Sequence, residues 1–265
     1  MLLASVTGDM LDWGKDAAGA LRSAVAAVVD LVVPPLCLAC HRPLSSHDAM
    51  CSRCWSGIDF IRAPLCARLG IPLPFDVGGT MISAAAVADP PDYDRARAVA
   101  RFDGVMRELV HDLKFRDRHD ARRLFTRWLT EAGAELLDGA DVVIPVPLTR
   151  GRLAGRRFNQ SAILAQEVAR LSGVRYEPLV LQRTKRTQPQ VGLSRQQRRD
   201  NVAGAFGVVD ARKSALAGAR VVLIDDVITT GATARACART LKRAGVASVD
   251  VLALAMVTDP ALLSP

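Results

Sequence analysis

The sequence VVLIDDVITTGATA, at residues 221–234, decides the fold class of this chain. Its first four residues are apolar and predict a strand buried on both faces, which should end where Asp225 and Asp226 begin. The small residues over 229–233 predict a turn, and the spacing beyond them predicts a helix that stops at Gly245. A helix N-terminus presents unpaired N–H groups and a positive dipole, so this arrangement predicts an anion site beside two carboxylates. A sugar phosphate with Mg²⁺ would suit such a site; the alternative is an ordinary crossover with two solvated aspartates.

Strands and helices alternate along much of the chain. Strand patterns fall at 82–88, 141–146, 176–182, 220–224 and 248–255, and helical patterns at 159–172 and 232–245. From Ala96 a short extended segment leads into two further helices. This order implies an α/β fold with a parallel sheet and right-handed crossovers, and we see no internal repeat. We divide the chain into an N-terminal amphipathic helix (1–35), a cysteine module (36–70), a linker or edge hairpin (71–95) and the α/β domain (96–265).

Charge and hydropathy limit the partners of the chain. Its 265 residues are 50% hydrophobic and carry a formal net charge of +8, which favours phosphates, nucleic acid or an anionic membrane surface. The N-terminal helix, near 11–33, either packs on the protein or contacts a membrane. Acidic residues interrupt the N-terminal apolar stretches, so no secretory signal is expected. The apolar stretch 31–39 falls far short of the about 20 residues that span a bilayer, so we expect a cytoplasmic protein.

Four of the six cysteines form two C-x₂-C pairs ten residues apart, namely Cys37, Cys40, Cys51 and Cys54. Two such pairs supply the four thiolates of a closed, tetrahedral, structural zinc site. A small core of reduced cysteines is the alternative, although so short and polar a segment could hardly fold without metal. Cys66 is left over, and Cys237 is expected to be a small packed residue.

The stretch at 221–233 resembles the signature of type I phosphoribosyltransferases. That resemblance implies that Asp225 and Asp226 hold the ribose hydroxyls of phosphoribosyl pyrophosphate and that a loop wraps its 5′-phosphate. The loop residues would be Thr229, Thr230, Gly231, Ala232 and Thr233. The rival phosphate motifs G-x-G-x-x-G and G-x-x-x-x-G-K-[ST] are absent from the sequence.

A cysteine module ahead of this signature resembles the ComF family, which joins zinc ribbons to a type I phosphoribosyltransferase fold and is linked to DNA uptake and natural transformation. The segments LVHDLKFRD, VIPVPLTRGRLAGRRFNQ and LQRTKRTQPQVGLSRQQRRDNVAGAF resemble family blocks. The second block implies a pyrophosphate loop with Arg150, Arg156, Asn159 and Gln160. The other two imply catalytic roles for Lys114 and Arg186. Many relatives carry a further C-x₂-C where this chain has Cys66 and Leu69, so we expect one zinc per chain.

Three functions remain open at this point. The chain could transfer phosphoribosyl, with Mg²⁺, onto an unidentified acceptor. It could be a non-catalytic accessory protein that handles single-stranded DNA with other uptake proteins, its pocket sensory or vestigial. It could also be a regulator, which the lack of a helix-turn-helix pattern disfavours. The arginines of the basic blocks suit pyrophosphate or a nucleic-acid groove, but also a solvated face.

Overall fold

The computed structural model describes residues 34–76, 78–115, 121–148, 158–185 and 195–258 of the chain. The chain divides into two compact units between Ser52 and Arg53. The predicted N-terminal helix, the arginines at 150–157 and Arg186 lie outside the described residues.

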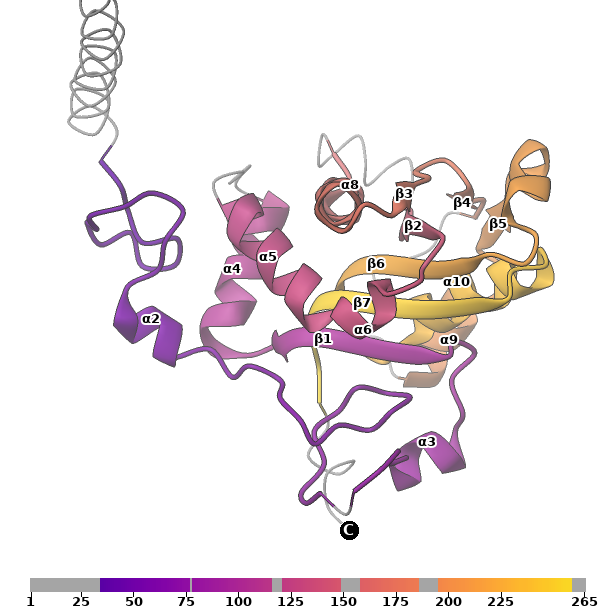
Figure 1. The fold of residues 1–265 in the computed structure, drawn as a ribbon, viewed down its shortest axis with the longest axis horizontal. Coiled ribbons are helices and arrows are strands. Elements are labelled where there is room, and N and C mark those ends of the chain that lie inside the picture. The colour runs from indigo at the N-terminus through magenta and orange to yellow at the C-terminus, as the bar shows by residue number, and fades with distance from the viewer. Residues whose placement is uncertain (1–33, 77, 116–120, 149–157, 186–194, 259–265) are drawn as a thin grey trace, which may run out of the picture. The chain divides into compact units, whose positions relative to one another are not determined.

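A parallel sheet of five strands forms the centre of the second unit, in the order β1-β7-β6-β2-β3 (Figure 1). The strands are β1 (Arg95–Arg101), β2 (Val142–Pro145), β3 (Arg175–Tyr176), β6 (Arg220–Ile228) and β7 (Ser248–Met256). An antiparallel pair, β4 (Leu181–Arg183) and β5 (Phe206–Val208), stands apart from this sheet. The α/β prediction is therefore confirmed.

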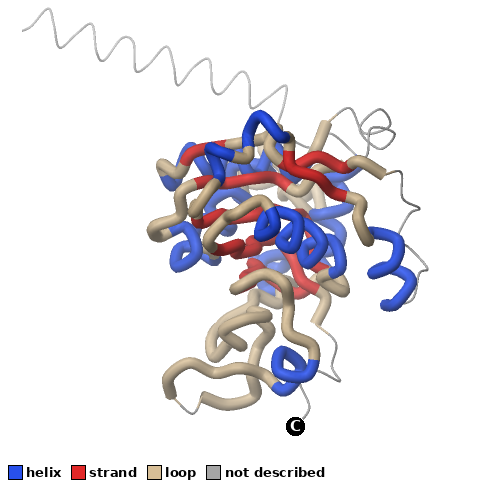
Figure 2. Tube along the Cα trace, turned by 90° about the vertical axis from the view of Figure 1, so that its right-hand side faces the viewer, coloured by secondary structure: helices blue, strands red, loops and turns tan. Residues whose placement is uncertain are grey.

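Helices cover both faces of the sheet, and Figure 2 shows the red strands among blue helices. Helices α5 (Arg122–Ala132) and α8 (Gln160–Ser172) contact each other and the strands of one face, while α10 (Ala232–Arg243) packs on the other. Side chains alternate along β6: Val221 and Leu223 join the buried cluster that α10 covers, so Val222 and Ile224 point to the opposite face. Burial on both faces explains why this strand is a continuous apolar run.

The other α-helices of the described residues are α2 (Ser52–Ser56), α3 (Ala84–Ala88), α4 (Gly104–Phe115), α6 (Ala134–Leu137) and α9 (Arg195–Val202). Two single-turn 3₁₀ helices, η2 (Asp210–Arg212) and η3 (Ser214–Leu216), precede β6. The strand predicted over 82–88 is wrong. Ser83 caps a helix there, because its side chain accepts a hydrogen bond from the Ala86 amide and four of the five helical residues are alanine. Among the described residues, no helix is long and apolar enough to cross a bilayer.

Candidate functional site

The acid pair lies inside β6, not after it. The strand continues four residues beyond the predicted end because β7 still pairs with it, Asp225 opposite Ala253 and Ile228 opposite Met256. The Ser161 hydroxyl, from the start of α8, donates to Asp225 Oδ1 at 3.4 Å, and the Asp226 amide donates to the same oxygen at 2.9 Å. Both side chains are partly exposed. The sheet therefore presents two carboxylates near the carboxyl end of a central strand, where doubly wound folds bind ligands.

Asp225 also influences the pKa of a buried thiol, that of Cys237. Burial raises the pKa of Cys237 in α10 well above its usual value, and the charge of Asp225 raises it further. The thiol is wholly enclosed by the core that α10 shares with the sheet. Cys237 is therefore the inert packed residue that the sequence predicts.

The small-residue turn brings an uncapped helix start beside the acids. Gly231 has φ +71° and immediately precedes α10, so this position needs the left-handed conformation that glycine adopts at no cost. No side chain caps the first turn of α10 at this residue. The Thr230 hydroxyl oxygen is buried and has no hydrogen-bond partner among the residues that the structure describes. A helix start without a side-chain cap and a buried hydroxyl beside it form the local chemistry of an anion site.

A cavity of about 190 Å³ opens beside this turn. Its wall includes Thr229, Thr230 and Gly231 of the turn, together with Leu69, Ile71, Ala85 and Ala88. Tyr93 also lines it, and burial raises the pKa of this phenol to about 12, so its hydroxyl is neutral at physiological pH. A Cβ at Gly231 would lie 3.7 Å from the Tyr93 hydroxyl oxygen. Sequence reasoning missed Tyr93, which carries no motif of its own.

Of the four residues predicted for the pyrophosphate loop, the structure describes Asn159 and Gln160. Asn159 uses both ends of its amide inside the protein: Oδ1 accepts from the Ser161 amide at 3.1 Å, and Nδ2 donates to the Val146 carbonyl at 3.0 Å. It therefore caps α8 and holds the segment after β2. Gln160 is the first residue of α8 and is buried. Arg150 and Arg156 lie outside the described residues, and so does Arg186.

The arginines of the third family block, LQRTKRTQPQVGLSRQQRRDNVAGAF, are mainly structural where they are described. Arg183, in β4, lies over the ring of Phe206 with its guanidinium carbon 5.1 Å from the ring centre. Arg199, in α9, pairs with Asp89. Lys114 belongs to α4, but its side chain lies outside the described part of the structure.

A row of basic residues on α10 forms ion pairs with acidic residues of the same chain. Arg235, Arg239 and Lys242 pair with Asp89, Asp92 and Asp94. The Arg239–Asp92 pair is bidentate, with N–O distances of 3.0 and 2.9 Å, and it lowers the pKa of Asp92. The i, i+4, i+7 spacing of the basic residues opposite a D-x₂-D-x-D run was the available signal in the sequence. These cations therefore fix the segment before β1 and are not spare ligands for phosphate.

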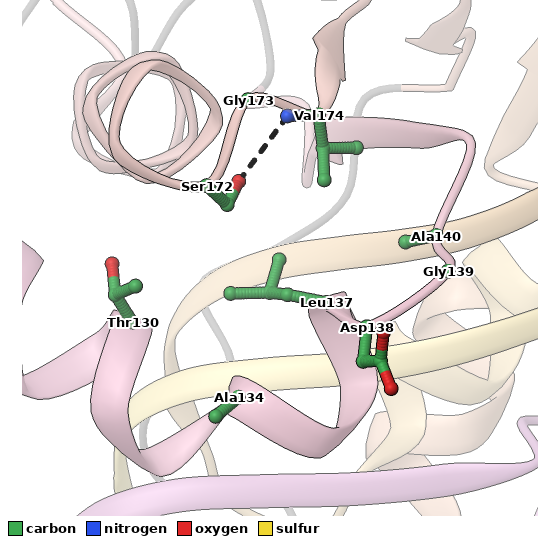
Figure 3. Close-up of a pocket in the computed structure, with 9 residues that line it drawn as sticks. All are labelled: Thr130, Ala134, Leu137, Asp138, Gly139, Ala140, Ser172, Gly173 and Val174. Carbon is green, nitrogen blue, oxygen red and sulfur yellow. Dashed lines mark hydrogen bonds between the residues drawn. The ribbon is translucent and has the colours of Figure 1, made fainter.

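A larger cavity of about 460 Å³ lies at the amino ends of two strands of the sheet (Figure 3). Gly139 and Ala140 precede β2, and Gly173 and Val174 precede β3, so the cavity lies at the amino ends of these strands. The Val174 amide donates to the Ser172 hydroxyl across its rim. Since the acids stand toward the carboxyl end of β6, this cavity is separate from the candidate site.

The four predicted zinc ligands come together. The sulfur atoms of Cys37, Cys40, Cys51 and Cys54 all lie within 4.8 Å of one another. Burial raises the pKa of the Cys37 thiol, but amide and thiol donors outweigh this and bring it to about 6. The Cys51 amide, for example, donates to Cys37 Sγ at 3.3 Å. Four clustered thiols with amide support fit a structural zinc ion.

Two family models match the chain: the double zinc ribbon domain over residues 28–86 and the phosphoribosyl transferase domain over residues 159–262. The molecule is thus of a class that joins an N-terminal zinc ribbon to a type I phosphoribosyltransferase fold. DNA utilization protein YhgH of Salmonella typhimurium is 32% identical over 230 residues, which cover 84% of this chain and 98% of the relative. Competence protein F of Haemophilus influenzae is 28% identical over 225 residues, covering 83% and 96%. This chain belongs to the ComF family.

Among solved structures, adenine phosphoribosyltransferase of Thermoanaerobacter pseudethanolicus aligns with 53% of this chain and 83% of its own, at 19% identity and a TM-score of 0.33.

Proposed function

We propose that the chain binds phosphoribosyl pyrophosphate, or a related sugar phosphate, at the end of β6 and serves a ComF-type role in DNA uptake. The unpaired Thr230 hydroxyl beside the uncapped start of α10 carries this proposal. A buried hydroxyl without a partner costs free energy in the unliganded protein, and a bound phosphate oxygen would remove that cost. Asp225 and Asp226, on the strand that leads into the same turn, would receive the ribose hydroxyls.

Mg²⁺ would enter with the ligand. Carboxylate oxygens are the ligands it prefers, and Asp225 and Asp226 supply them. The ion would neutralise charge on a departing pyrophosphate if transfer occurs. Arg150, Arg156, Lys114 and Arg186 keep the catalytic and binding roles that the family resemblance implies, as predictions.

Calorimetric titration with ribose 5-phosphate and with phosphoribosyl pyrophosphate, each with and without Mg²⁺, tests the proposal. Gly231→Val should abolish binding of both compounds, since the side chain is strained at φ +71° and enters the space that the phosphate needs. Gly173→Ala is the matched control, because Gly173 has φ +74° at the end of α8, away from the turn. Wild-type protein that binds neither compound would remove the proposal. If the wild type binds phosphoribosyl pyrophosphate, the protein should next be mixed with this compound, Mg²⁺ and a panel of bases. Release of pyrophosphate would indicate a transferase, and binding without release would indicate a sensor.

The accessory-protein role has support from a different surface. Trp55, Phe60 and Trp128 form an aromatic cluster with ring centres 5.1 to 5.6 Å apart. They line a cavity of about 260 Å³ beside the exposed Arg62, and 47% of Trp55 is accessible. Trp55 is the exposed ring of this cluster, since Trp128 is buried and Phe60 is half-buried. An exposed aromatic ring beside a cation can stack an unpaired base of single-stranded DNA.

Titration of a fluorescent oligonucleotide at two salt concentrations tests this second role. Phosphate contacts predict an affinity that falls steeply with salt, and Trp55→Ala should weaken it further. Phe75→Ala, at another exposed aromatic residue, is the control. Binding that is indifferent to both salt and Trp55 would rule the role out.

A further inference from the structure

We propose that residues 64–88 are a second ribbon, built like the first, that has lost its zinc and become a fixed wall of the cavity beside the 229–231 turn. The family model implies two zinc ribbons, but the chain has thiols for one complete site. The inference concerns what replaced the second metal ion and what the metal-free ribbon now does.

The two segments share a backbone plan over their first halves. Three backbone hydrogen bonds and one isolated β-bridge recur 29 positions later in the chain. In the first ribbon the bonds run from Cys37 N to Arg42 O (2.8 Å), His41 N to Cys37 O (3.0 Å) and Leu44 N to Pro35 O (2.9 Å), with a bridge between Leu36 and Pro43. In the second they run from Cys66 N to Ile71 O (2.9 Å), Gly70 N to Cys66 O (2.8 Å) and Leu73 N to Pro64 O (2.8 Å), with a bridge between Leu65 and Pro72. From the sequence we expected no internal repeat, and this prediction is wrong for the backbone of these two segments.

The correspondence continues after a three-residue insertion. The Ser83 amide donates to Cys66 Sγ at 3.3 Å, as the Cys51 amide does to Cys37 Sγ at the same distance. A five-residue helix begins at the next residue in both segments, α2 after Cys51 and α3 after Ser83. This register places Leu69 where the first ribbon has Cys40, Ser83 where it has Cys51, and Ala86 where it has Cys54.

These residues do not fit zinc. Leu69 and Ala86 have no donor atom, and the Ser83 hydroxyl is a poor substitute for a thiolate. The Cys66 sulfur instead accepts hydrogen bonds from the Ser83 hydroxyl at 3.3 Å and from the Leu69 amide at 3.4 Å. One thiol and its donors thus occupy the position of the former metal site.

Attachment to the sheet takes the place of the metal. The Ala96 amide of β1 donates to the Arg68 carbonyl at 2.8 Å, and the Arg68 guanidinium donates to the carbonyls of Pro91 and Tyr93. Gly70 lies so close that a Cβ would be 2.2 Å from the Ala96 carbonyl oxygen. Cys66 and Ala86 belong to the buried cluster that α10 and the sheet share. A ribbon held in this way needs no ion to stay folded.

The metal-free ribbon faces the candidate site. Leu69, Ile71, Ala85 and Ala88 line the same cavity as the 229–231 turn. On the proposed function, on which this step rests, the group next to the bound sugar phosphate would meet an apolar surface. Ligand binding at the turn would then be independent of zinc.

Hydrogen exchange of the wild-type protein tests the inference without a mutation. After chelation of the zinc, the amides of Cys37, His41 and Leu44 should lose protection, whereas those of Cys66, Gly70 and Leu73 should keep it. Loss of protection in both sets together would overturn the inference. Two zinc ions in the untreated wild-type protein would also overturn it. These outcomes do not depend on whether the protein binds phosphoribosyl pyrophosphate.

Restoring the lost ligands gives a second, constructive test. The triple variant Leu69→Cys, Ser83→Cys and Ala86→Cys should bind two zinc ions per chain where the wild type binds one. Adding Cys37→Ser to it should return the count to one, now held by the restored ribbon. A folded triple variant that still binds one zinc would refute the register. If the triple variant does not fold, the hydrogen-exchange comparison decides.

Discussion

Replacing Thr230 by valine should move stability and ligand affinity in opposite directions. The Thr230 hydroxyl is buried without a partner, and such a group costs about 1–3 kcal/mol. Valine has nearly the same shape and no polar atom, so Thr230→Val should raise the free energy of unfolding of the unliganded protein by about 1 kcal/mol. Thr230 also lines the cavity at the turn. On the proposed function, its hydroxyl would donate to a phosphate oxygen of the ligand.

The expected loss of affinity follows from the charge of that phosphate. A hydrogen bond to a charged group contributes about 1.5–3 kcal/mol, which corresponds to a rise in Kd of about 10- to 150-fold. Urea unfolding of the unliganded protein and calorimetric titration with ribose 5-phosphate measure the two effects separately.

Thr240→Val is the matched control for this prediction. Its hydroxyl lies on α10, the helix that follows the turn, and donates to the Ala236 carbonyl at 2.9 Å, so its removal should lower stability slightly and leave affinity unchanged. A Thr230→Val protein that is less stable than the wild type, or that binds ribose 5-phosphate equally well, would refute the reasoning.

Three further predictions concern the acid pair, the zinc and an ion pair. Asp225→Asn with Asp226→Asn should weaken Mg²⁺-dependent binding of phosphoribosyl pyrophosphate by about 1–3 kcal/mol in calorimetry, and unchanged affinity would exclude the ribose role. Cys54→Ser should lose the zinc in elemental analysis, whereas retention of a full equivalent would contradict the four-thiol site. Arg239 lowers the pKa of Asp92, so their pair stabilises the fold above about pH 4 and loses its effect as the pH falls through the lowered pKa of Asp92. Arg239→Gln should therefore be less stable than the wild type at pH 7 in thermal unfolding, with the difference shrinking toward pH 3; a constant difference would refute the ion-pair account.

The sequence by itself determined the features whose signal is local. The apolar run before Asp225, the small residues around Gly231 and the helical spacing beyond them sufficed for the α/β class and for the turn that precedes α10. The two C-x₂-C pairs sufficed for the zinc cluster, because metal ligands need particular residue types at short spacing.

Only the tertiary structure decided features that depend on a distant partner. β6 runs past its apolar residues because β7 supplies the pairing. Asp89, Asp92 and Asp94 pair with basic residues of α10, which lies about 145 residues further along the chain. The sequence showed that Leu69 cannot bind a metal ion, but it did not show that the segment around it is a ribbon, because leucine, serine and alanine at 69, 83 and 86 carry no metal signal. The pattern Pro-Leu-Cys, then five residues, then Pro-Leu occurs at 35–44 and again at 64–73. Only the structure shows that the backbone hydrogen bonds recur with this pattern, because the burial of the second segment against the sheet depends on residues far away in the chain.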